Sequence, residues 1–294
     1  MSSHTLSPVI RLDAATVLLQ WAVGGMAFCW YTTRRRQAGL GYGWLLRGIY
    51  LAMALGAFAA GVAFGAVPVR EAAALGVAAG CLVGLAVSVA RRKAGVRGQR
   101  AERDRRAARV AAMTGVDRPV PDAPDTPAGP EYPPALDLLP VVVGVVGLVA
   151  AALDAGGNPT VALLRTLAGA AFLGSVTDAM LLGHWYLVQP GLPRALLTEL
   201  VDAVLWVWPV EVIAMLLPTG MVSVWTGAVD DGWGGVLGWF WAACATATLV
   251  LLLVTKAALR ERGYSAVMAA TGLLYLAILT AVGTDLVARA VLAS

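Results

Sequence analysis

The sequence predicts an all-α, polytopic integral membrane protein with about eight transmembrane helices, and three observations support this fold class. Hydrophobic residues make up 59% of the 294 residues and charged residues 14%. This composition is more apolar than a soluble protein needs to form its core. The apolar residues fall into runs of about 20, the length that a helix needs to cross roughly 30 Å of hydrocarbon. Every second connection between these runs is rich in arginine or lysine.

The predicted helices are 14–33, 44–66, 71–90, 136–154, 161–188, 195–217, 235–257 and 264–290. No basic region precedes the first of them, so we expect this helix to be retained rather than cleaved as a signal peptide. The third contains Gly76, Gly80 and Gly84, a row of small residues at a spacing of four that favours the close approach of another helix. We expect this helix to pack tightly against the second. In the eighth, Asp285 and Arg289 are four residues apart and can neutralise each other, which indicates a structural pair.

Residues 91–135 form the one long polar segment, and they divide the chain into a three-helix part, 1–90, and a five-helix part, 136–294. The segment begins with many arginines and ends with many prolines, and its second half has a composition that cannot pack a core. Its first part could form a short helix held near anionic head groups by arginine. We prefer that interpretation to a nucleic-acid-binding arm, and we expect no nucleic-acid partner.

The charge of the short connections predicts the orientation of the chain. Basic residues follow the first, third, fifth and seventh helices, whereas the alternate connections are poor in them. Because short loops rich in arginine and lysine stay in the cytoplasm, we expect these loops inside and both termini outside. The expected location is a bacterial-type cytoplasmic (inner) membrane, with the lipid bilayer and either other membrane subunits or further copies of the chain as partners.

A weak internal repeat of four plus four helices is one interpretation of the aromatic pairs Trp30-Tyr31 and Trp185-Tyr186. Both pairs end a helix before a basic connection, four helices apart, as in a parallel duplication. A competing internal similarity relates the first two helices to the last two, through Gly41-Tyr42 and Gly263-Tyr264. The simpler alternative is that tryptophan and tyrosine anchor helix ends at the membrane interface.

The hairpin of residues 161–218 carries four carboxyl groups and a histidine inside two apolar helices. Such groups are costly in lipid and therefore mark a functional site by default. The candidates for binding a quinone or a proton are Thr177, Asp178, His184, Trp185, Tyr186, Glu199, Asp202 and Glu211.

The periodicity of an α-helix predicts the depth and the helix face of these candidates. Asp178 lies about two turns deeper than His184, and Glu199 and Asp202 share one face of the next helix. Pro209 is expected to kink that helix beside Glu211. We therefore predict a ladder of titratable groups leading from the cytoplasm into the bilayer, in which Asp178, His184 and Asp202 face one another.

Three functions fit such a ladder, and the first is preferred because His184, Trp185 and Tyr186 lie at shallow depth. In it, the protein is a membrane subunit of an electron-transfer assembly that meets quinone at the cytoplasmic end of the fifth and sixth helices. The second is proton- or ion-coupled transport of a small molecule, in which a buried carboxylate changes its charge. The third is an accessory or assembly protein without chemistry.

Several other chemistries lack the residues that they need. The only other histidine, His4, lies at the opposite end of the predicted fold from His184, so no bis-histidine haem can form within the chain. The three cysteines, Cys29, Cys81 and Cys244, form no CxxC or Cys/His cluster, and no metal site is expected. No P-loop or GxSxG motif is present, and the only cofactor that the residues suggest is quinone.

Cysteine labelling on intact cells tests the predicted topology. In a variant that lacks the three native cysteines, a cysteine introduced at Ala128 should resist an impermeant thiol reagent, because the basic segment is expected inside. A cysteine introduced at Asp230, in a connection expected outside, is the matched control and should react. Labelling at position 128 from outside would contradict the orientation.

Overall fold

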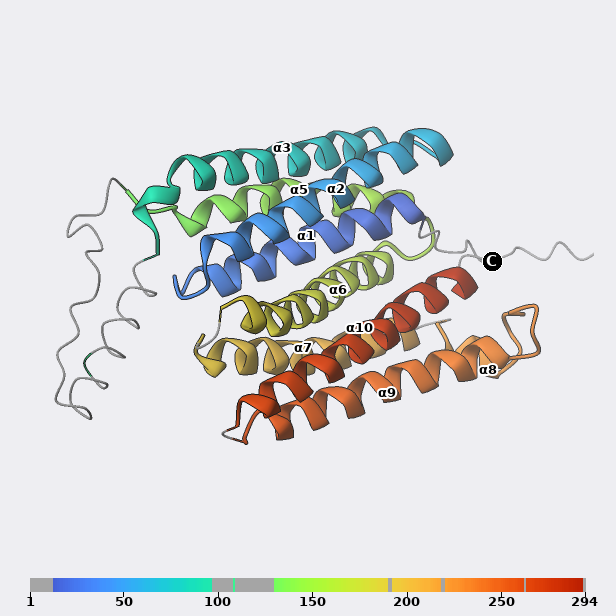
Figure 1. Ribbon diagram of the computed structural model, residues 1–294. Coiled ribbons are helices and arrows are strands. Elements are labelled where there is room, and N and C mark those ends of the chain that lie inside the picture. The colour runs from blue at the N-terminus through green and yellow to red at the C-terminus, as the bar shows by residue number, and fades with distance from the viewer. Residues whose placement is uncertain are drawn as a thin grey trace, which may run out of the picture.

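Eight long helices lie side by side and make up most of the molecule (Figure 1). The structure is a computed structural model that describes residues 13–96, 108, 130–189, 192–217, 220–261 and 263–292. The long helices are α1 (Ala14–Thr33), α2 (Leu40–Phe64), α3 (Pro68–Ala90), α5 (Leu138–Asp154), α6 (Pro159–Val188), α7 (Arg194–Leu216), α9 (Val236–Ala258) and α10 (Tyr264–Leu292). The described residues also include three short helices, η1 (Arg92–Ala94), η2 (Pro134–Asp137) and α8 (Val222–Trp225).

The predicted fold class is confirmed, because the described chain is helical and seven of its helices are long and apolar enough to cross a membrane. The remaining long helix, α7, has 23 residues, which is also sufficient length. Glu199, Asp202 and Glu211 interrupt its apolar sequence. Pro209 lies inside α7, and the helix continues beyond it to Leu216.

Local signals explain where the helices begin. Asp13 caps α1 by accepting a hydrogen bond from the Thr16 backbone N–H at 2.7 Å. Burial raises the pKa of this carboxyl, but the hydrogen bonds from Thr16 and Arg70 outweigh it and hold the pKa below its usual value. Helix α3 begins at Pro68, three residues before the predicted start, because proline is tolerated in a first turn.

Helix α6 is the centre of the bundle. It packs against α1, α5, α7 and α10. In its most apolar stretch 67% of the residues are buried inside the protein, compared with 33% in the peripheral α9. In Figure 1, α1, α2, α3 and α5 lie on one side of α6, and α7, α9 and α10 lie on the other. The largest hydrophobic cluster runs through this arrangement from Leu19 on α1 to Ala281 on α10. Side chains on α6 can therefore meet either group of helices.

Glycines permit the closest helix contacts. A Cβ on Gly174 of α6 would overlap the backbone of Gly24 on α1, so only glycine allows these two helices to approach as they do. Helices α2 and α3 pack together as predicted. Gly76 and Gly80 of α3, however, face α5, since a Cβ on Gly80 would stand 3.1 Å from Pro140, whereas Gly84 faces Tyr132 and, on α2, Arg47.

The two ends of the bundle differ in charge. The connections after α1, α6 and α9 and the start of the long polar segment lie together at the left of Figure 1, and we call this the basic end. The connections after α2, α5 and α7 lie at the opposite end. The alternation seen in the sequence is thus an asymmetry between two faces of the molecule. Most of the segment 91–135, including the predicted surface helix, lies outside the described residues.

Candidate functional site

Asp178 is a fully buried carboxyl in the middle of the bundle, with 0% of its surface exposed. It lies ten residues from the end of α6, which is about 15 Å along the helix. The hydroxyl of Tyr50, on α2, donates a hydrogen bond to its Oδ1. Its Oδ2 has no hydrogen-bond partner among the described residues. The Tyr42 hydroxyl approaches the Asp178 backbone carbonyl at 3.4 Å.

Neighbouring residues fix this arrangement. A Cβ on Gly25 of α1 would overlap the ring of Tyr50, so the glycine makes room for the tyrosine to reach Asp178. The Thr177 hydroxyl accepts a hydrogen bond from Trp21 Nε1 at 2.7 Å and donates to the Leu173 carbonyl at 2.6 Å. Three helices, α1, α2 and α6, therefore hold the carboxyl in place.

No cation accompanies Asp178, and this separates it from most other acidic groups on the described helices. The acidic groups in ion pairs are Asp137 with Arg47, Asp285 with Arg289, Asp202 with Lys256, Glu199 with Arg35 and Glu71 with Arg70. Within the part of the chain that the structure describes, Asp178 takes part in no ion pair, and Tyr50 is its hydrogen-bond partner. Among the predicted site residues, it combines full burial with a single side-chain hydrogen bond, from a neutral group.

The three aromatic candidates at the end of α6 point in different directions. His184 is exposed, with Nδ1 3.2 Å from the Tyr275 hydroxyl of α10. Trp185 packs against Tyr42 of α2, with ring centroids 5.9 Å apart. Tyr186 is buried and donates a hydrogen bond to the Pro193 carbonyl at 2.7 Å. Consecutive residues of a helix are about 100° apart, so these side chains cannot line one pocket.

The carboxylates of α7 also separate. Glu199 forms an ion pair with Arg35 at 2.6 Å, and Asp202 forms one with Lys256 at 2.7 Å. Both pairs are partly exposed, which agrees with the structural interpretation of these residues. Asp178 contacts α2, His184 contacts α10 and Asp202 contacts α9, so the structure does not assemble the predicted ladder.

Glu211 is the one α7 candidate that is fully buried. It lies near the opposite end of the bundle, where its electrostatic neighbours are Asp285 and Arg289 of α10 and Arg165 of α6. The ion pair between Asp285 and Arg289 was predicted from their spacing and is confirmed, at 2.6 Å.

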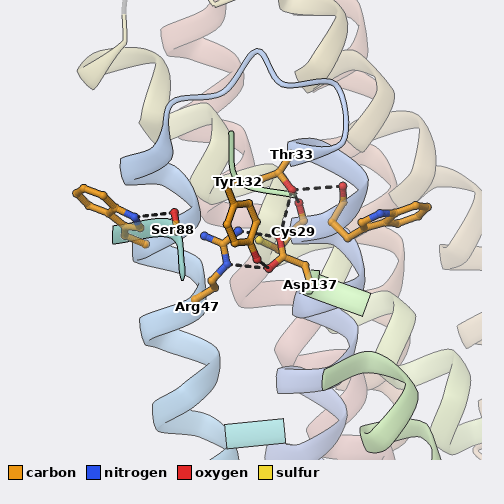
Figure 2. Close-up of polar contacts among 8 residues, drawn as sticks. Cys29, Thr33, Arg47, Ser88, Tyr132 and Asp137 are labelled. Carbon is orange, nitrogen blue, oxygen red and sulfur yellow. Dashed lines mark hydrogen bonds and ion pairs between the residues drawn. The ribbon is translucent and has the colours of Figure 1, made fainter. Parts of the chain in front are cut away.

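A buried ion pair at the basic end, shown in Figure 2, was not among the predicted features. The Arg47 guanidinium of α2 donates two hydrogen bonds of 2.7 Å to the Asp137 carboxylate. Tyr132 donates to the same carboxylate at 2.8 Å, and its ring lies 4.3 Å from the guanidinium carbon. Burial and the charge of Asp137 raise the pKa of the Tyr132 hydroxyl, which keeps it a donor. The available signal was a lone arginine and a lone aspartate, each near the basic end of an apolar helix.

Breaking this pair should destabilise the fold. Arg47→Met leaves the buried Asp137 charge uncompensated, and we expect a loss of about 3–5 kcal/mol in the free energy of unfolding. The double variant Arg47→Met/Asp137→Leu should lose less than the single variant, because no charge is left alone. Arg35→Gln, which breaks the exposed pair with Glu199, is the control and should cost about 0–1 kcal/mol. Unfolding in mixed micelles measures all three, and additive losses in the double variant would contradict the pairing.

Comparison with known proteins finds no matching family model, no matching curated protein and no matching solved structure.

Proposed function

We propose that the protein is a proton-coupled transporter of a small molecule, and that Asp178 is the group that binds and releases the proton. The observation that carries this proposal is the burial of Asp178 in the middle of the bundle without a cation. Transporters place their coupling groups near the midplane of the membrane, and ionisable residues at that depth belong to ion and proton pathways.

The chemistry follows from the partners of the carboxyl. An uncompensated charge costs several kcal/mol in such surroundings, whereas a carboxylate paired with arginine is held in its ionised form. Among the described residues, the side-chain partner of Asp178 is a tyrosine hydroxyl, which can donate to a carboxylate and can accept from a protonated carboxyl. Both protonation states can therefore keep the contact with Tyr50.

Coupling to movement has a physical basis in the same contact. The hydrogen bond between Tyr50 and Asp178 joins α2 to α6. A change in the charge of Asp178 changes the strength of this bond, and so favours a different packing of the two helices. That link between protonation and helix packing is what a proton-coupled transporter requires.

Proteoliposomes with a trapped pH-sensitive dye test the proposal. Given an imposed pH gradient and a panel of amino acids, sugars and organic ions, the native protein should admit protons with one of these solutes. Asp178→Asn should reduce this flux at least about tenfold, because the amide cannot carry a proton. Asp202→Asn, which alters a half-exposed ion pair, is the matched control and should retain most of it. Equal fluxes in the two variants, normalised to inserted protein, would contradict the role of Asp178.

A second candidate function rests on the exposed pair of His184 and Tyr275. His184 lies four residues from the end of α6, about 6 Å deep, and Tyr275 is 43% exposed. Their polar atoms are 3.2 Å apart on the surface of the bundle, where a quinone dissolved in the bilayer can reach them. We propose on this observation the alternative of a membrane subunit of an electron-transfer assembly, with quinone bound by hydrogen bonds to this pair.

Quinone titration of the protein in nanodiscs tests the alternative. His184→Ala should weaken binding by about fivefold, since a hydrogen bond contributes about 1 kcal/mol. Trp206→Ala, which removes an 80% exposed aromatic side chain from α7, is the control and should leave binding unchanged. Similar quinone binding in both variants and in the native protein would exclude the site. Losses that follow only the amount of folded protein would support an accessory role instead.

A further inference from the structure

A second group of buried polar side chains lies near the opposite end of the bundle, between α1, α6, α7 and α10. Glu211 and Asp285 are each 0% exposed, and Arg165 and Arg289 are each 2% exposed. Arg289 donates hydrogen bonds of 2.6 and 2.7 Å to Asp285. Arg165 donates to the backbone carbonyls of Ala214 and Leu217, at the end of α7.

Gly169 lets α6 fit over this group. A Cβ on Gly169 would stand 2.9 Å from Asp285 Oδ1 and 3.0 Å from Gln20 Nε2. Gln20, on α1, is fully buried and donates a hydrogen bond to the Thr166 carbonyl. Four helices thus bring their polar side chains to one place.

Several polar atoms of this group have no hydrogen-bond partner among the described residues. They are Glu211 Oε1 and Oε2, Gln20 Oε1, Thr166 Oγ1 and Arg289 Nη1. Buried polar groups are nearly always hydrogen-bonded, so the two unpartnered oxygens of Glu211 distinguish it from the ion-paired acids of the bundle. Glu211 is unusual because both oxygens lack a partner, although its carboxyl lies beside that of Asp285.

We propose that Glu211 and Asp285 form a proton-binding site, in which Glu211 takes up one proton and donates it in a hydrogen bond to Asp285. Two carboxyl groups can hydrogen-bond to each other only when one of them carries a proton. The proton explains the contact between the two acids and gives one Glu211 oxygen a hydrogen-bond partner. This site is separate from Asp178 and does not depend on the proposed function.

The charges make proton binding reversible. With both carboxyls ionised, two guanidinium groups balance two carboxylates and the site is neutral. With one proton bound, the site carries a single positive charge, and the Arg165 guanidinium is stabilised by its hydrogen bonds to the Ala214 and Leu217 carbonyls. Neither state leaves an isolated carboxylate in the bundle, in contrast to a deprotonated Asp178.

The site lies close to the opposite end of the bundle. Glu211 is five residues from the end of α7 and Asp285 is seven residues from the end of α10, so both are about 7–11 Å below the opposite end. Asp178, in contrast, lies on the far side of α6. It is nine residues beyond Gly169, which is a rotation of about 180°.

Infrared difference spectroscopy of the full chain in nanodiscs, with the proton itself as the probe in a pH titration, tests this site. At neutral pH the native protein should show a protonated-carboxyl C=O stretching band that Glu211→Gln removes, whether or not Asp178 contributes a band of its own. Asp285→Asn should shift the band, because the hydrogen-bond acceptor changes. Glu199→Gln alters a partly exposed ion pair, and it is the control that should leave the band unchanged.

Two further measurements test the site if the Glu211 variant does not fold and separate it from Asp178. If Glu211→Gln does not fold, labelling glutamate with carbon-13 in the native protein should shift the same band, whereas labelling aspartate should not. Asp178→Asn should leave the Glu211 band in place, so a failure of the proposed transport function is distinguishable from a failure of this site. A native protein without a protonated glutamate band at neutral pH overturns the proposal.

Discussion

The cost of placing a charge in an apolar bundle is the constraint on which this structure depends. The buried charges are compensated mainly by groups on other helices, so the compensation also ties the helices together. Arg47 of α2 binds Asp137 at the start of α5, and Arg165 of α6 binds carbonyls at the end of α7. Arg70 of α3 binds Asp13 before α1 and the Gly65 carbonyl after α2. Polar contacts at the two ends thus supply the specificity that apolar packing in lipid cannot.

Helix α6 shows how the same constraint produces two distinct polar regions. Small residues let α1 approach it closely at Gly174, and Asp178 projects from it toward α2. Gly169, on the opposite face, opens space for the ion pair of α10. Because α6 is buried on both faces, each polar side chain must find its partner on a specific neighbour. The position of α6 at the centre of the bundle therefore decides which groups can meet.

Much of the fold could be predicted from the sequence, because apolar runs and basic connections are local signals. The pair of Asp285 and Arg289 was equally predictable, since its spacing lies within one helix. The pairing of Arg47 with Asp137 was not, because the residues are 90 positions apart and only tertiary packing brings them together. The arrangement of Asp178, His184 and Asp202 was not predictable either, because helical spacing does not say which neighbouring helix each side chain meets.

Three buried carboxyls illustrate how partners decide what an acidic group can do. Asp137 has two hydrogen bonds from Arg47 and one from Tyr132, so its ionised form is fully satisfied and it acts as a structural element. Asp178 has a tyrosine and no cation, so its charged form has little to stabilise it. Glu211 has an acid beside it and two arginines nearby, so both of its forms are accommodated. Burial is common to all three, and the difference in their partners is what separates a structural carboxylate from groups suited to proton exchange.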